Sequence, residues 1–459
     1  MKRISIIIAF CLIVSMFWSI SLDESISLAK QNNKDLLSSK EDLQKAEQTY
    51  YQVRANIYPQ LNVVGAYSLN KTYLPDSAIV PPIDLSLGLD PDTASPNDYY
   101  LANVMSAALN SLVPSSPMEE GSMALSLQMQ QVLFTGGKLN YGIKTADIYR
   151  NIQQLNYQLK EQDIILKTTQ MFYSCLLADK LVNVQEAALE TARHHLARVE
   201  AFANEGLVSD FDVMRARLEV AKLEPQLMQA QNSRDLALSA FRTQIGVNDP
   251  TIVPEGNLVL PPKLDITLDE ALTQGLENRI ELTMAKKGTE VADLQLKTEK
   301  AGYFPNLALQ ASAALYTKAD EYAIEGDDFG TNYSIGLGIS FPLFNGFATK
   351  AKVNSAKSSY RQSQYQEQKY EDLIRLEITQ NYQKLRHAEK NYLVQEENMK
   401  MAERSLQLAQ LRYENQVGIQ LEVFDAQTTL SAIQLQYYQS IYEVISATRE
   451  LQKSLGMNF

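Results

Sequence analysis

Apolar and polar residues alternate along four short stretches of the chain, residues 60–69, 123–133, 306–316 and 332–343. In the last stretch every second residue is large and apolar, and the residues between them are small or polar: Tyr333, Ile335, Leu337, Ile339, Phe341 and Leu343 alternate with Ser334, Gly336, Gly338 and Ser340. Because successive side chains of a strand point to opposite faces, this pattern predicts β-strands with one apolar face. About ten residues is the length that a tilted strand needs to cross a bilayer. A half-buried sheet on a soluble core fits the same pattern, so the alternation alone leaves both interpretations open.

Two long stretches with a helical period follow strands, at about residues 137–203 and 347–413. In the second, apolar residues recur every seven positions: Ile378, Leu385, Tyr392, Met399, Leu406 and Tyr413. Neither proline nor glycine interrupts it, and a helix of this length would be about 100 Å long at 1.5 Å per residue. The heptad spacing predicts close packing of long helices as in a coiled coil.

The chain is duplicated. Leu22-Asp23-Glu24 recurs as Leu268-Asp269-Glu270, an offset of 268 − 22 = 246, and Gly246-Val247-Asn248 recurs as Gly456-Met457-Asn458, an offset of 456 − 246 = 210. The repeats are predicted at 22–248 and 267–459, joined by the proline-rich linker 249–266. The first copy therefore holds 246 − 210 = 36 extra residues, which lie in the loop 70–121.

Four strands cannot close a barrel, because small barrels have about eight strands or more. Open strand edges do not occur in lipid. If these strands span a membrane, several chains must share one barrel, and three chains would supply 3 × 4 = 12 strands.

The first residues predict export. Lys2 and Arg3 precede the uncharged, mostly apolar run 4–20, and small residues precede Leu22, which is the layout of a signal peptide covering residues 1–21. A retained membrane anchor is the alternative. No other stretch approaches the roughly 18 apolar residues of a spanning helix, and a formal net charge of −12 argues against nucleic-acid binding.

The residues give no sign of an enzyme. His194, His195 and His387 lack the spacing of a zinc site and are interpreted as helix-surface residues. The segment Gly136-Gly137-Lys138 lacks the upstream glycine of a phosphate-binding loop. We therefore predict no catalytic residue, no cofactor and no metal, and a passive form of transport.

The whole mature chain resembles the TolC family of outer-membrane efflux proteins. The resemblance rests on the duplicated layout and on three short motifs: Pro342-Leu343-Phe344-Asn345-Gly346, Gly206-Leu207-Val208-Ser209 followed by Asp212-Val213, and Val423-Phe424-Asp425-Ala426-Gln427. It implies a mainly α protein with membrane β-strands, in which a homotrimer shares a 12-stranded β-barrel and long coiled-coil helices form a periplasmic α-barrel. It also implies a place in the outer membrane, extending into the periplasm. The expected partners are a periplasmic adaptor (a membrane fusion protein), an inner-membrane pump and outer-membrane lipid. Loop 70–121 would then be extracellular, as a cover for the mouth or as a mobile surface loop.

The resemblance also implies two kinds of site at the helix turns. The adaptor-docking tip would comprise Gly206, Leu207, Val208, Gln416 and Gly418, although a glycine such as Gly206 is also typical of any helix C-terminus. The aperture gate would comprise Asp212, Tyr413, Glu422 and Asp425, whose carboxylates, repeated by three-fold symmetry, would favour cations. Acidic residues in a first helical turn also simply complement the helix dipole. Gly418 stands where the family can carry an arginine that bridges to the neighbouring tip. The resemblance therefore does not settle whether a salt bridge closes the aperture at that point.

The function that these inferences favour is the exit duct of a tripartite efflux or type I secretion system. A coiled-coil structural or adhesive envelope protein is the main alternative, and a stand-alone porin is another. The sequence does not identify the exported substrate, the pump or the adaptor.

Overall fold

The computed structural model describes residues 18–73, 75, 81–112, 118–319, 329–415 and 417–457. They form two compact units. The helical unit comprises the described residues within 1–50, 144–295 and 355–459, and the sheet unit those within 51–143 and 296–354.

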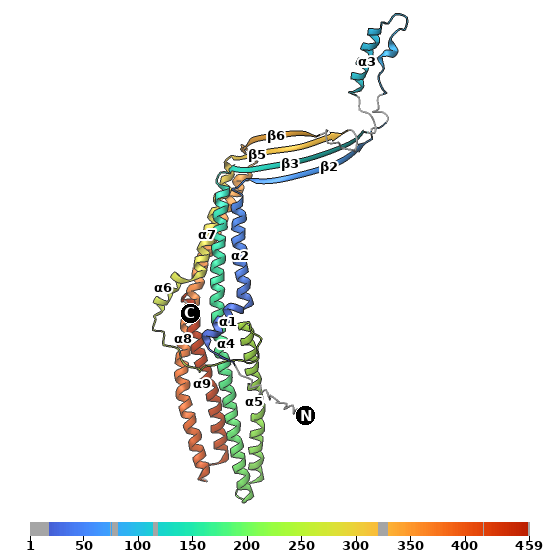
Figure 1. Ribbon diagram of the computed structural model, residues 1–459. Coiled ribbons are helices and arrows are strands. Elements are labelled where there is room, and N and C mark those ends of the chain that lie inside the picture. The colour runs from blue at the N-terminus through green and yellow to red at the C-terminus, as the bar shows by residue number, and fades with distance from the viewer. Residues whose placement is uncertain are drawn as a thin grey trace, which may run out of the picture. The chain divides into compact units, whose positions relative to one another are not determined.

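The sheet unit is built on one four-stranded antiparallel sheet in the order β2-β3-β5-β6, so β2 and β6 are its edges (Figure 1). The strands are β2 (Gln60–Thr72), β3 (Met118–Phe134), β5 (Asn306–Ala319) and β6 (Gly330–Ser340). The strand predicted at 332–343 ends three residues earlier than expected. Pro342 has no backbone N–H to donate to a ladder, which explains why the strand cannot continue through it.

The register aligns the alternation of all four strands, so the sheet has one apolar and one polar face. One cross-strand row is Val63, Leu127, Ala313 and Tyr333, and the adjacent row is Asn62, Gln128, Ser312 and Ser334. On the polar face the hydroxyls of Ser312 and Ser334 lie 2.8 Å apart. On the apolar face Tyr333 and Ile335 are each more than three-quarters exposed within the single chain. The described residues leave this apolar face uncovered.

The connection between β2 and β3 contains a helix that the sequence interpretation missed. It comprises the 3₁₀ turn η2 (Leu85–Gly88) and α3 (Pro96–Asn110). Ser95 and Asp98 form a capping box, and Pro96 occupies the first helical position. Asn110 closes the segment, because its side chain exchanges two hydrogen bonds with the backbone of Ile83, at 2.7 and 2.9 Å.

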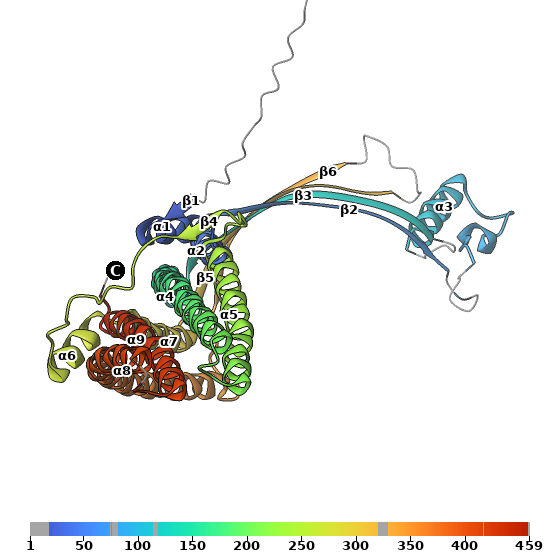
Figure 2. The ribbon, with the colours of Figure 1, turned by 90° about the horizontal axis from the view of Figure 1, so that it is seen from below.

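The helical unit is dominated by two antiparallel helix pairs, α4 with α5 and α8 with α9 (Figure 2). The two long helices, α4 and α8, agree with the predicted ranges to within one residue at each end. None of the described helices has the length and apolar character needed to cross a membrane. The helices are α1 (Leu22–Asn32), α2 (Lys34–Ala55), α4 (Lys138–Asn204), α5 (Asp210–Ile245), α6 (Leu268–Asn278), α7 (Ile280–Lys300), α8 (Ala348–Glu414) and α9 (Gln420–Ser454), and a short turn, η3 (Ala301–Tyr303), follows α7.

The two repeats build equivalent hydrophobic cores. One core joins α1, α2, α4 and α5, and the other joins α6, α7, α8 and α9. Residues that are related by the offsets of 246 and 210 occupy matching buried positions: Leu36 and Leu282, Ile164 and Ile374, Cys175 and Leu385, Phe241 and Leu451, Ile245 and Leu455. The duplication seen in the sequence is therefore a duplication of packing.

A small parallel sheet joins the start of the described chain to the linker. It pairs β1 (Trp18–Ile20) with β4 (Ile252–Pro254). Ile20 is buried in the first core, and Ser21 caps α1 through a hydrogen bond from the backbone N–H of Glu24. Most of the predicted signal peptide, residues 1–17, lies outside the described residues. Cleavage after Ser21 would remove β1 and this cap, and the cleavage position stays a prediction.

Candidate functional site

The turns α4–α5 and α8–α9 lie at the same end of the helical unit (Figure 1). In the first tip, defined here as residues 205–209, Gly206 has a φ of +75° and its N–H donates to the carbonyl of Ala203 at 2.9 Å. The N–H of Leu207 donates to the carbonyl of Phe202 at 2.9 Å. These two bonds satisfy carbonyls that the helix end would otherwise leave unpaired. The Leu207 side chain is 57% exposed, whereas Val208 packs against the cluster around Val199 and Phe424.

The second tip, residues 415–419, is closed by Arg412. The N–H groups of Val417 and Gly418 donate to the Arg412 carbonyl at 2.9 and 3.0 Å. Gln416, a predicted docking residue, lies outside the described residues. Val417 and Ile419 are 69% and 60% exposed, so this tip also presents apolar side chains to solvent. The motif comparison missed both residues, because it followed the glycine of the first tip rather than the apolar neighbours of the turn.

The Asp212 carboxylate is occupied within its own turn. It accepts a hydrogen bond from the Ser209 hydroxyl at 2.6 Å, and the backbone N–H of Asp212 donates to the Ser209 hydroxyl oxygen at 3.3 Å. The hydrogen bond from the Ser209 hydroxyl, and then one from the Ser209 backbone N–H at 3.1 Å, hold the pKa of the Asp212 carboxyl below its usual range. The backbone carbonyl of Asp212 also accepts a hydrogen bond from the Gln420 side chain at 3.5 Å, which links the starts of α5 and α9. Asp212 therefore belongs to the capping box of α5 and is hydrogen-bonded to the first residue of α9.

Tyr413 lies between the two helix pairs. Its ring is centred 5.2 Å from the ring of His195 and 6.5 Å from that of Phe202, both on α4. Burial, and secondarily the negative charge of Asp212, raise the pKa of Tyr413. The structure thus brings the predicted gate residues Asp212 and Tyr413 into one neighbourhood.

Glu422 has a partner that the sequence interpretation did not foresee. Its Oε2 lies 3.4 Å from Nε of Arg412, within the same tip. A Cβ added to Gly418 would lie 2.9 Å from the Arg412 Cβ and 3.1 Å from the Glu422 Oε2, so glycine leaves room for this ion pair. Asp425 is exposed, and none of the described residues forms an ion pair with it. Arg412 and Glu422 thus form an ion pair within one chain, on the two sides of the second tip.

Two further residues of α4 join the tips. Arg198 and Glu414 of α8 form an ion pair of 2.7 Å. His195 is only 8% exposed, so its interpretation as a helix-surface residue was wrong. The spacing carried a signal: His195 lies three residues after Ala192 and four before Val199, both buried, so it falls on the same face of α4. Contacts between helices so distant in sequence are not encoded in local spacing.

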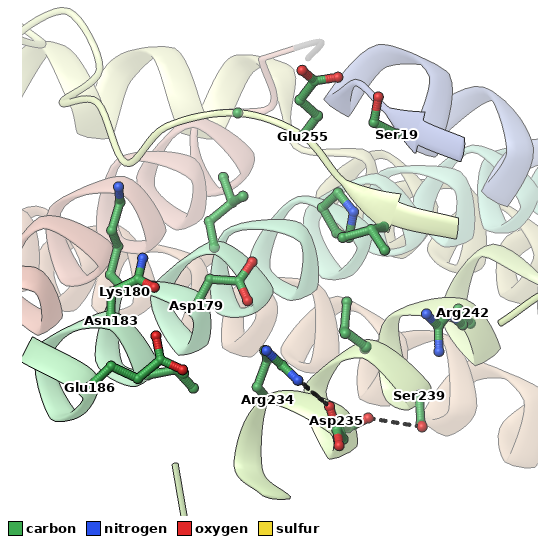
Figure 3. A pocket seen from close by; sticks show the side chains of 16 residues that line it. Ser19, Asp179, Lys180, Asn183, Glu186, Arg234, Asp235, Ser239, Arg242 and Glu255 are labelled. Atoms are coloured by element: carbon green, nitrogen blue, oxygen red, sulfur yellow. Dashed lines mark hydrogen bonds and ion pairs between the residues drawn. The ribbon is translucent and has the colours of Figure 1, made fainter. Parts of the chain in front are cut away.

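A second concave region lies away from the tips, between α4, α5 and the linker strand β4 (Figure 3). Its volume is about 820 Å³. Arg234 pairs with Asp235 at 3.1 Å, and Arg242 donates to the carbonyls of Pro250 and Ile252. Burial raises the pKa of Asp179, opposed by the charges of Arg234 and Lys180. Arg242 thereby fastens the linker to α5.

Known proteins are similar to this chain in sequence and in fold. The family model of outer membrane efflux proteins matches residues 25–247 and 271–457. The outer membrane protein TolC of Salmonella enteritidis is 25% identical over 386 residues, which cover 82% of this chain and 74% of TolC. The solvent efflux pump outer membrane protein SrpC of Pseudomonas putida is 24% identical over 438 residues, covering 94% and 84%.

A solved structure agrees over almost the whole length. The outer membrane protein VceC of Vibrio cholerae superimposes with a TM-score of 0.73 at 18% identity, covering 95% of this chain and 96% of VceC. The family match spans both repeats and leaves out mainly the first residues and the linker. The chain belongs to the outer membrane efflux protein family.

Proposed function

We propose that three copies of this chain form the outer-membrane exit duct of a tripartite efflux or type I secretion system. The observation that carries the proposal is the two-faced sheet with open edges at β2 and β6. Lipid would cover the apolar row of Val63 and Tyr333, and water would fill the side of Asn62 and Ser334. Since open edges are not tolerated in lipid, β2 of one copy would pair with β6 of the next.

The long helices support the second half of the proposal. Strands that merely formed a pore would not need helices of 67 residues such as α4 and α8. We infer that the helices extend into the periplasm and present their tips to an adaptor, which links the duct to an inner-membrane pump. Leu207, Val417 and Ile419 are the exposed apolar side chains that docking would cover. The pump would supply the energy, and the duct would conduct passively.

The proposal is tested first by the native mass of the protein extracted from outer membranes in mild detergent. We expect about three times the mass of the mature chain, and discrete ion conductance after reconstitution into planar bilayers. A monomeric mass would exclude the shared barrel. A trimer without any conductance would favour the coiled-coil structural or adhesive protein instead.

Neutralising the gate carboxylates should change ion selectivity. Replacing Glu422→Gln and Asp425→Asn together is expected to lower the cation-to-anion permeability ratio about fivefold, because a close charge pair in water is worth about 1 kcal/mol. The ratio is measured from reversal potentials in a salt gradient. Asp42→Asn, an exposed carboxylate on α2, serves as the matched control. An unchanged ratio in the double variant would place these carboxylates outside the constriction.

A further inference from the structure

The side chain of His195 on α4 contacts both helices of the second pair. Its ring is centred 5.2 Å from the ring of Tyr413, near the end of α8, and 4.9 Å from that of Phe424, near the start of α9. The contact with Phe424 is edge-on, with the ring planes at 76°. One residue of the first repeat therefore packs between the end of α8 and the start of α9, the two helices that the second tip connects.

The polar side of this ring is unsatisfied. Among the described residues, Nε2 of His195 has no hydrogen-bond partner, although the atom is buried. It adjoins a cavity of about 180 Å³ between α4, α5 and α9. The side-chain oxygens of Gln185 and Gln427, which line the same cavity, also lack partners. Unpaired buried polar groups are costly and uncommon, so three of them around one cavity call for an explanation.

The surroundings oppose a positive charge on the ring. Charged or titratable side chains near it include Arg198 of α4, Tyr413 and Glu414 of α8, and Asp212 and Glu219 of α5. Arg198 already holds Glu414 at 2.7 Å, and Lys222 lies 3.3 Å from Glu219. The residues of α9 that line the cavity are uncharged. Burial, and then the charge of Arg198, lower the pKa of His195 from 6.5 to about 4.

We propose that His195 holds the two tips together while its ring is neutral and releases them when Nε2 takes up a proton from the periplasmic solvent. The inference rests on the duct function proposed above, and it adds a gate residue together with the condition that opens the gate. Separation of the tips would expose the new imidazolium to water, where its charge is hydrated. The contacts of the His195 ring with Tyr413 and Phe424 would be lost in the same step.

The direction of the pH effect follows from the two states of the ring. The packed tip binds a proton only near pH 4, whereas an exposed histidine binds one near 6.5. The contribution of His195 to the closed tip is therefore complete above pH 6.5 and is lost as the pH falls from about 6.5 to about 4. Within that window the ratio of closed to open tips should fall by up to about tenfold per pH unit, since the open state binds one more proton.

The test measures tip separation directly. Spin labels at Glu205→Cys and Asn415→Cys, in a Cys175→Ala background, report the distance between the tips in the detergent-purified full assembly at pH 7.5 and pH 5. We expect the labels to move apart at pH 5 in the parent protein. His195→Phe keeps an aromatic ring in the contact but cannot be protonated, so its labels should stay close at both pH values.

His194→Phe is the matched control, because the neighbouring His194 is 77% exposed and should leave the pH response intact. If His195→Phe fails to assemble, His195→Gln replaces it. Equal label distances at both pH values in the parent protein would overturn the proposal, as would an equal shift in His195→Phe. Because the labels report without any current or export, failure of the duct function would appear separately, as a trimer that does not conduct.

Discussion

Export should be lost when Leu207 is replaced by serine, while the fold and the assembly remain intact. The turn does not depend on this side chain, because the backbone N–H groups of Gly206 and Leu207 make its hydrogen bonds. Leu207 is instead 57% exposed at the end of a helix pair, where only a partner could bury it. Burying a leucine side chain contributes about 2 kcal/mol. Three equivalent tips acting on one assembly would multiply the loss to about 6 kcal/mol, or more than 10⁴-fold in overall affinity.

The experiment compares substrate accumulation in cells that carry the parent protein or Leu207→Ser as their sole copy. Leu87→Ser is the control, because Leu87 is 84% exposed in the β2–β3 connection and should tolerate the change without loss of export. Native mass and melting temperature verify that both variants assemble. Full export by a correctly assembled Leu207→Ser protein would contradict adaptor docking at the first tip, and Val417 and Ile419 would become the next candidates.

The repeating parts of this molecule could be predicted from sequence because their signals are local. A period of two produced the strands, and a period of seven placed Ile378 and Leu385, both buried, on the inner side of α8. The helix α3 was missed even though Ser95, Pro96 and Asp98 form a standard helix start. The many prolines of the loop were given more weight than this capping signal.

The tip contacts could not be predicted, for a different reason. The pair Arg198–Glu414 joins residues 414 − 198 = 216 positions apart, and the contact of His195 with Phe424 spans 424 − 195 = 229. Such pairs depend on how two helix pairs are rotated against each other, and neither the heptad nor the motif specifies that rotation. Alignment to the family predicted where the tips are, whereas the residues that tie them together came only from the structure.

The largest loss of stability is expected from Gly246→Ala, at the corner where α5 ends. Gly246 has a φ of +71°, and an added Cβ would lie 2.6 Å from the backbone oxygen of Asn32. That backbone cannot easily move away, because the side chain of the next residue, Asn33, donates to the carbonyl of Gln244 at 2.8 Å in the buried core. The clash therefore adds to the cost of a left-handed alanine, which alone is about 1 kcal/mol.

Gly206→Ala separates the cost of the left-handed backbone from the cost of the steric clash. Gly206 has nearly the same backbone conformation, with a φ of +75°, but a Cβ added there would have no neighbouring atom within 4 Å. We expect a total loss of about 3 kcal/mol for Gly246→Ala, or a fall of about 5 °C in melting temperature, against a third of that for Gly206→Ala. Thermal unfolding followed by circular dichroism measures both. Equal shifts would mean that the Asn32 contact relaxes freely.

The second repeat offers an internal check of the same argument. Gly456, related to Gly246 by the offset of 210, has a φ of +69°, and its added Cβ would lie 2.8 Å from the backbone of Asn278. There the next residue is Arg279, whose buried guanidinium is held by Glu281 and Glu377 at 2.8 Å. If an anchored neighbour is what makes the corner rigid, Gly456→Ala should be as costly as Gly246→Ala, although an ion pair replaces the amide. A much smaller loss of stability for Gly456→Ala would show that the backbone held by the Arg279 ion pairs can move away from the added Cβ, whereas the backbone held by the Asn33 amide cannot.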